Sequence, residues 1–221
     1  MGQLDKFSIK GLPGFKSGEG QSLLGNASTP LIETFSCGTD ENKKLCKKTI
    51  NPWSFSADNR DAPLIEKINS KMGNYVVIQY AENIVDFKIT YDTKYRVKDV
   101  IPVDQSITPA RCLAPASVSK GLKSDGYRTG RVVKISSKGL VSATKSFEVI
   151  FQVGNSGSQF IEMSAESEEM ANCLLEWVVS GRKAKLTYTQ SYLRNPLARD
   201  TSYEILSVES DSAPAATGLT Q

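Results

Sequence analysis

The chain has 221 residues, a formal net charge of only +3, and the apolar and charged fractions of an ordinary soluble globular protein. It contains no histidine, which excludes Ser-His-Asp and Cys-His catalysis, so we expect no enzymatic activity and no cofactor. Four cysteines without a C-x-x-C pair do not suit a metal site, and without a run of 18 apolar residues no membrane insertion is expected.

Residues 1–28 are punctuated by glycine and proline, above all between Gly11 and Gly20, and the sequence predicts a flexible N-terminal arm. No Gly-Lys-[Ser/Thr] follows the spaced glycines, so this stretch lacks the pattern of a phosphate-binding loop. No secretory signal is expected, because the N-terminus has no apolar core segment.

Residues 29–104 are expected to form a first β-rich domain. The predicted elements are strands at 31–36, 45–50 and 53–57, a helix at 61–72, and strands at 75–81 and 95–103. Pro63 falls in the first turn of the predicted helix, where proline is tolerated.

Residues 105–126 contain Pro109, Pro115 and many small residues, which is typical of a linker. A second domain is predicted for 127–210, and a disordered tail for 211–221. The predicted elements of this domain are a strand at 130–135, a second strand that runs through 140–144 and 147–153, and a third at 159–163. A helix from Ser164 or Ser167 to Gly181 and strands at 183–192 and 202–209 follow. A turn is predicted at 136–139.

An internal repeat connects the two domains at an offset of 108 positions. Residues 92–100 and 200–208 both have the sequence Asp-Thr-x-Tyr-x-[Val/Ile]-x-x-Val. Eight columns between 53–100 and 161–208 are identical, where unrelated sequences give about three. They are Ser56, Ala57, Gly73, Tyr80, Asp92, Thr93, Tyr95 and Val100 in the first copy. The alternative is a coincidence between two similar β units.

Each domain therefore has the predicted order β-β-β-α-β-β, which is the connectivity of the OB-fold barrel. The sequence predicts a mainly β protein made of two tandem five-stranded OB-like barrels, each with a helix between strands 3 and 4. The repeated tyrosines, Tyr80 and Tyr95 in the first copy, are expected in the barrel cores.

The segment 126–139 has the sequence Gly-Tyr-Arg-x-Gly-Arg-Val-Val-Lys-x-Ser-x-Lys-Gly, and it is followed by Lys-x-x-Tyr at 185–188 and Asp-Thr-x-Tyr at 200–203. This combination resembles a family of uncharacterised bacterial proteins over about residues 126–208. The resemblance implies a β-barrel and no known activity. Such proteins sometimes carry a dehydrogenase name, but this chain has no G-x-G-x-x-G after a strand, so that activity is not expected.

Seven basic residues stand against one acid between Ser117 and Phe147. In an OB barrel this region covers the first two strands, and the loop between strands 4 and 5 adds two arginines and a tyrosine. Cations for phosphates and aromatic faces for bases suit single-stranded nucleic acid. The candidate contact residues are Arg128, Arg131, Lys134, Lys138, Lys145, Tyr192, Arg194 and Arg199. The alternative is that these cations only solvate the barrel surface.

The function that the sequence favours is a non-enzymatic binding or adaptor module, a structural or interaction subunit of a larger protein assembly. Other protein subunits are then the expected partners, and single-stranded nucleic acid is the alternative ligand. The chain ends are rich in small residues and could become ordered on a partner. A Ser-x-x-Lys sequence at Ser117 lies in the predicted linker, which does not suit a catalytic motif.

The four cysteines are Cys37, Cys46, Cys112 and Cys173. Cys173 lies in an apolar helical stretch and is expected to be a small core residue. Cys37 and Cys46 could form a bridge across a hairpin in an oxidising compartment. Because no secretory signal is recognised, we expect free thiols and a cytoplasmic location.

Overall fold

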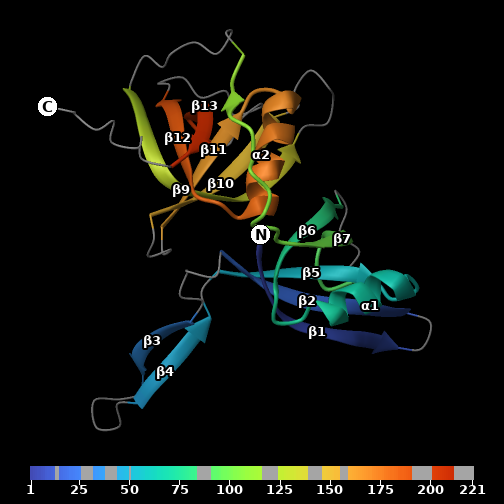
Figure 1. Ribbon diagram of the computed structural model, residues 1–221. Coiled ribbons are helices and arrows are strands. Elements are labelled where there is room, and N and C mark those ends of the chain that lie inside the picture. Colours follow the sequence, from blue (N-terminus) through green and yellow to red (C-terminus); the bar gives the residue numbers. More distant parts are fainter. Residues whose placement is uncertain are drawn as a thin grey trace, which may run out of the picture. The chain divides into compact units, whose positions relative to one another are not determined.

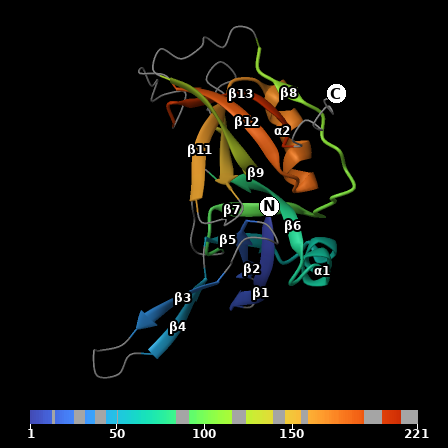
Figure 2. The ribbon, with the colours of Figure 1, turned by 60° about the vertical axis from the view of Figure 1, so that its left-hand side comes forward.

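The computed structural model describes residues 1–12, 15–25, 32–37, 44–49, 51–83, 91–115, 124–138, 146–154, 159–190 and 201–211. The chain divides into two compact units, unit 1 (Met1–Asp104) and unit 2 (Gln105–Asn155 and Gln159–Gln221). Each unit contains curled strands and one helix (Figure 1, Figure 2).

Unit 1 is a closed barrel of five strands. Its elements are β1 (Gly2–Leu12), β2 (Phe15–Leu24), β5 (Pro52–Asp58), α1 (Ala62–Ser70), β6 (Tyr75–Glu82) and β7 (Tyr95–Pro102). The strands are hydrogen-bonded in the order β1-β2-β5-β7-β6, and β6 returns to β1 to close the ring. Only the pairing of β5 with β7 is parallel. This is the predicted OB-like connectivity, with α1 between the third and fourth strands.

Unit 2 has the same connectivity. Its elements are β8 (Cys112–Leu113), β9 (Ser124–Lys138), β10 (Ser146–Val153), β11 (Gln159–Ala165), α2 (Glu168–Ser180), β12 (Ala184–Gln190) and β13 (Tyr203–Ser210). The order is β11-β10-β9-β12-β13, and a parallel pairing of β11 with β13 joins the two ends. The short β8 pairs with β13 as a sixth strand.

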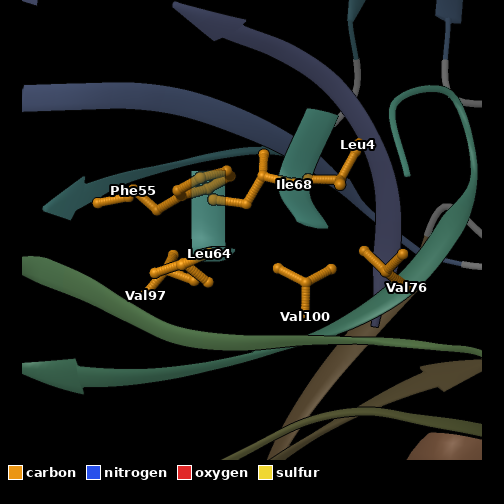
Figure 3. Packing of buried hydrophobic residues seen from close by; sticks show 8 residues of the cluster. Leu4, Phe55, Leu64, Ile68, Val76, Val97 and Val100 are labelled. Carbon is orange, nitrogen blue, oxygen red and sulfur yellow. The ribbon is translucent and has the colours of Figure 1, made fainter. Parts of the chain in front are cut away.

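The interior of unit 1 is filled by apolar side chains that alternate along its strands and by one face of α1. Figure 3 shows these side chains pointing toward one another: Leu4, Phe55, Leu64, Ile68, Val76, Val97 and Val100. Burying one such side chain contributes about 1.5–3 kcal/mol to stability. The barrel is therefore closed around its own core.

Capping and one ion pair fix α1. The Asp61 side chain accepts a hydrogen bond from the backbone N–H of Leu64 at 3.1 Å, as an N-cap should. Lys67 of α1 reaches Asp99 of β7 at 2.6 Å, and this hydrogen bond holds the pKa of Asp99 below its usual value. Because both side chains are more than one-third exposed to water, the pair adds little to stability.

The predicted helix of the second domain is confirmed as α2, with both ends where the sequence indicates them. Ser167 caps it by accepting from the backbone N–H of Met170 at 3.1 Å, and two glutamates occupy the first turn. Gly181 ends it in the left-handed conformation, with φ of 60°.

The repeated residues occupy equivalent positions in the two barrels. In the parallel closing pairs, Ser56 faces Arg96 and Ser164 faces Glu204, which are the same two positions 108 residues apart. Tyr80 and Tyr95 form an edge-to-face pair at 5.4 Å, and the corresponding tyrosines of unit 2, Tyr188 and Tyr203, do the same at 5.4 Å. All four rings are only half-buried, so they are not enclosed core residues as predicted; Tyr95 packs against the core of unit 1 and Tyr203 lines a pocket of unit 2.

The predicted flexible arm at 1–28 is wrong for the residues that the structure describes. Those residues form β1 and β2, the first two strands of barrel 1. The glycines that suggested flexibility are instead required by packing: a Cβ on Gly20 would lie 2.3 Å from the ring of Phe55. Glycine in a strand here marks a close approach, not a break.

The strands predicted at 31–36 and 45–50 exist but do not belong to barrel 1. They are β3 (Ile32–Cys37) and β4 (Lys44–Thr49), which, among the strands that the structure describes, pair with each other alone in a separate two-stranded sheet. They lie between the second and third barrel strands in the chain. With β1 and β2 already in the ring, the barrel has no edge for them.

The predicted linker at 105–126 is wrong in its described parts. Gln105 to Asn155 belongs to unit 2, β8 pairs with β13, and Ser124 already starts β9. The predicted turn at 136–139 is also wrong as far as Lys138, because β9 continues through it. Residues 116–123, and the predicted tail after Asp211, lie outside the described residues.

The prediction of free thiols is wrong for two of the cysteines. Cys112 and Cys173 form a disulfide, with their Cα atoms 5.8 Å apart. The two residues are 61 positions apart, so no local spacing could indicate the pairing. The bridge does not suit the cytoplasmic location that was expected from the missing secretory signal, since such bridges persist in oxidising compartments. The side chains of Cys37 and Cys46 lie outside the described part of the structure.

Candidate functional site

A pocket of about 540 Å³ opens in unit 2 beside β11 and the start of β13. Its lining residues combine one guanidinium, two aromatic rings and several hydrogen-bonding groups. They are Arg128, Gln159, Phe160, Ile161, Glu162, Thr201, Ser202 and Tyr203. The volume lies within the usual range for sites that bind small molecules or single groups of a larger ligand.

Arg128 reaches the pocket from the inner face of β9. It alternates with Gly126 and Gly130, where an added Cβ would meet the rings of Tyr188 and Phe151. The Arg128 guanidinium lies 5.8 Å from the centroid of the Tyr188 ring, within the range of a cation–π contact. The pocket therefore holds a positive charge supported by an aromatic face.

The start of β13 is tied to β11 by one threonine side chain. Thr201 Oγ1 donates to the carbonyl oxygen of Glu162 at 3.1 Å and accepts from the backbone N–H of Tyr203 at 3.1 Å. Both partners line the pocket. These two bonds fix the backbone on that side of the pocket before any ligand arrives.

The equivalent region of unit 1 is occupied by an indole. Trp53 stands 108 positions before Ile161, and its ring packs at 4.9 Å from Tyr80 and 5.3 Å from Tyr95. Unit 2 has the smaller Ile161 at this position, and Ile161 lines the pocket. The exchange of tryptophan for isoleucine accounts for the different character of this region in the two barrels.

A buried carboxylate on the second strand of each barrel has a structural role. Glu19 accepts hydrogen bonds from Ser17 at 2.6 Å and from Ser56 at 2.7 Å. In unit 2 the carboxylate of Glu148 accepts from Ser164 at 3.2 Å. Ser56 and Ser164 lie in the parallel strand pairs β5–β7 and β11–β13. Each carboxylate therefore links the second strand of its barrel to the parallel pair.

Two of the predicted contact residues lie on the outer face of β9, opposite Arg128. Arg131 pairs with Gln152 and Lys134 with Ile150, on the face of β10 opposite Val149 and Phe151, where Gln152 is itself buried. The Arg131 Nε donates to the carbonyl oxygen of Gly181 at 2.9 Å, where it complements the C-terminal end of α2. Burial lowers the pKa of the Arg131 guanidinium below its usual value.

The structure thus does not bring Arg128, Arg131 and Lys134 together on one face. The side chains of the other five predicted contact residues lie outside the described residues: Lys138, Lys145, Tyr192, Arg194 and Arg199.

The sequence analysis did not single out Phe160, Glu162 or the uncharged polar lining residues as contact residues of a site. Position 161 carried a usable signal, because the internal repeat aligns it with a tryptophan. Among the described residues, no group of three or more Cys, Asp or Glu side chains is placed to hold a metal ion. No helix in the described ranges is long and apolar enough to cross a membrane.

No family model and no curated protein matches the chain. Among solved structures, one match is a deletion mutant of the single-stranded DNA binding protein from Thermus aquaticus, with 11% identity over 97% of this chain and 94% of that chain. Its TM-score is 0.25. At that score and identity the similarity supports no argument, and the proposals below rest on the residues of this chain.

Proposed function

We propose that the chain is a non-enzymatic binding protein whose unit 2 binds single-stranded nucleic acid at the pocket between β11 and β13. The observation that supports this is the meeting of the Arg128 guanidinium with the rings of Phe160 and Tyr203 in one pocket. Aromatic faces stack on bases and a guanidinium pairs with phosphate, so a single strand can use both kinds of group at once.

The rim of the pocket supplies hydrogen-bonding groups for the edge of a base. Gln159 and Glu162 are exposed at the pocket, and Ser202 adds a hydroxyl. A duplex keeps its bases stacked and paired, so only an unpaired base can enter a pocket of this size. Single strands are therefore the expected ligand, and duplexes should bind more weakly.

The direct test is fluorescence anisotropy with a labelled single-stranded oligonucleotide of mixed sequence at low salt. We expect binding that weakens steeply with added salt, because bound phosphates release counterions. Arg128→Glu should reduce the affinity at least about tenfold, and Phe160→Ala should reduce it about 5- to 150-fold, the effect of losing one stacked base.

Lys98→Glu is the matched control, because Lys98 is an exposed cation of unit 1 and the change in net charge is the same. No binding at low salt would end the proposal. Equal losses in Arg128→Glu and Lys98→Glu would also end it, since they would show a response to net charge and not to the pocket.

The adaptor role, which the sequence analysis based on the chain ends rich in small residues, stays a prediction.

A further inference from the structure

The part of β11 that lines the pocket carries an aromatic ring and a carboxylate on one face. Phe160 and Glu162 are two positions apart in a regular strand, so their side chains point to the same side of the sheet. Two residues of a strand span about 7 Å, which sets the ring and the carboxylate next to each other. The hydrogen bond from Thr201 Oγ1 to the carbonyl oxygen of Glu162 fixes the backbone at this place.

The barrel fold itself does not require these two side chains. At the offset of 108, position 160 corresponds to Pro52 and position 162 to Ser54 of β5. Two residues further on, Ser164 has a serine as its counterpart and joins the parallel pair of β11 with β13. The ring and the carboxylate are therefore particular to the pocket of unit 2, while the residue that closes the barrel is shared.

A carboxylate beside a bound nucleic acid repels the phosphates of the ligand. In the part of the chain that the structure describes, neither Glu162 nor Arg128 forms an ion pair that would cancel its charge. The repulsion is offset when the carboxylate accepts hydrogen bonds from the ligand. The pocket therefore favours a ligand that presents a phosphate to Arg128 and a hydrogen-bond donor to Glu162.

The two oxygens of an ionised carboxylate only accept hydrogen bonds, so they bind best to two neighbouring donors. Guanine has two such donors on its Watson–Crick edge, the N1–H and the exocyclic N2 amino group. Cytosine and adenine have one amino group beside an acceptor nitrogen, and thymine has one N–H between two carbonyl oxygens. These neighbouring acceptors repel a carboxylate.

The uncharged polar groups of the pocket do not discriminate between bases in this way. Gln159, Thr201 and Ser202 each combine donors with acceptors, so they can adapt to any base edge. Among the described residues that line the pocket, Glu162 is the one whose side chain only accepts. It is therefore the group that can select a base.

We infer that the pocket of unit 2 selects guanine, with the base stacked on Phe160 and its Watson–Crick edge bound by the Glu162 carboxylate. This inference rests on the proposed binding of single strands. It leaves the Arg128 guanidinium to a phosphate of the same strand. A guanine paired with cytosine has this edge occupied, so the selection applies to unpaired bases.

The test uses the full chain and labelled oligothymidines that differ only at one central position, which is guanine, adenine, cytosine or thymine. A single guanine avoids the four-stranded structures that runs of guanine form. Fluorescence anisotropy at low salt measures the affinities. We expect the guanine strand to bind about 5- to 150-fold more tightly than the thymine strand, the discrimination of one bidentate pair.

Two base analogues identify the edge that the pocket reads. Hypoxanthine keeps N1–H and lacks the amino group, so most of the preference should be lost. 7-Deazaguanine keeps both donors and lacks the N7 acceptor, so it should bind as guanine does. The reverse pattern would place the guanidinium of Arg128 at the base edge in place of Glu162, and it would overturn the inference.

The variant that tests the carboxylate is Glu162→Gln, which replaces one of its two acceptors by a donor. It should reduce the preference for guanine over thymine at least about fivefold, without weakening the binding of the thymine strand. Glu169→Gln is the matched control, because Glu169 is an exposed acid of α2 and the change in charge is the same. An equal preference for guanine in the two variants would contradict the role of Glu162.

The same measurements separate this inference from the proposed function. Equal affinity for all four central bases would overturn the selection of guanine and leave single-strand binding in place. Absence of binding by every strand at low salt would end both.

Discussion

At the scale of one residue, Glu19 shows what the repeated Ser56 does in unit 1: the Ser56 hydroxyl donates a hydrogen bond to the Glu19 carboxylate. Its carboxylate is enclosed and accepts from Ser17, Ser56 and the backbone N–H of Asp92. These three donors come from β2, β5 and the segment that leads into β7. The carboxylate therefore holds together the strands that meet at the parallel seam.

Glu19→Ala should destabilise unit 1 by about 2–4 kcal/mol, because buried donors would lose their acceptor and a void would remain. Glu19→Gln keeps one acceptor and should cost less. Glu66→Ala is the control, since Glu66 is an exposed acid on α1. Urea unfolding measures all three, and equal effects of the Glu19→Ala and Glu66→Ala variants would contradict the structural role.

At the scale of elements, several contacts hold β8 and the residues on either side of it against the rest of unit 2. The carbonyl oxygen of Ala110 accepts from Trp177 Nε1 at 2.9 Å, and Ala114 N donates to the carbonyl oxygen of Leu206 at 2.8 Å. The disulfide joins Cys112 of β8 to α2. This segment covers Trp177, which is almost fully buried.

Cys112→Ser should destabilise unit 2 by about 2–4 kcal/mol, the usual effect of a bridge that closes a long loop. The variant and its parent protein should both carry Cys37→Ser and Cys46→Ser, so that reductant acts on the Cys112–Cys173 bridge alone. Reduction there should shift the emission of Trp177 to longer wavelength and add the mass of two hydrogens. An unreduced mass equal to the reduced one would show that the bridge does not form.

At the scale of the whole molecule, each unit has its own closed barrel and its own core. Domains of about 100 residues can bury enough surface to fold alone. We expect fragments 1–104 and 105–211 to unfold cooperatively in urea, each with its own near-ultraviolet circular dichroism. A fragment 127–211, which lacks β8 and Cys112, should be less stable than 105–211. A non-cooperative transition in either longer fragment would contradict independent folding.

Most elements of unit 2 follow from local patterns. The alternation of Phe147, Val149 and Phe151 predicts a strand, and Ser167 and Gly181 mark the ends of a helix. Such signals depend on residues that are close together in the sequence, so they can be recognised without knowing the tertiary structure. The pocket did not follow in this way, because Arg128 and Tyr203 are 75 positions apart and meet only when β9 and β13 flank β12.

The sequence alone determined the mainly β class, the two-barrel order and the repeat, since strand periodicity and helix capping are local properties of the chain. Only the tertiary structure decided that the glycine-rich start supplies two barrel strands, because it takes the ring of Phe55 to show why Gly20 has no side chain. It also decided which cations share a face. The bulge at Val133 puts Lys134 on the same face as Arg131, although the two are three positions apart. Arg128 lies on the opposite face, as strand alternation requires, and only the tertiary structure shows that its face leads to the pocket and that of Arg131 to α2.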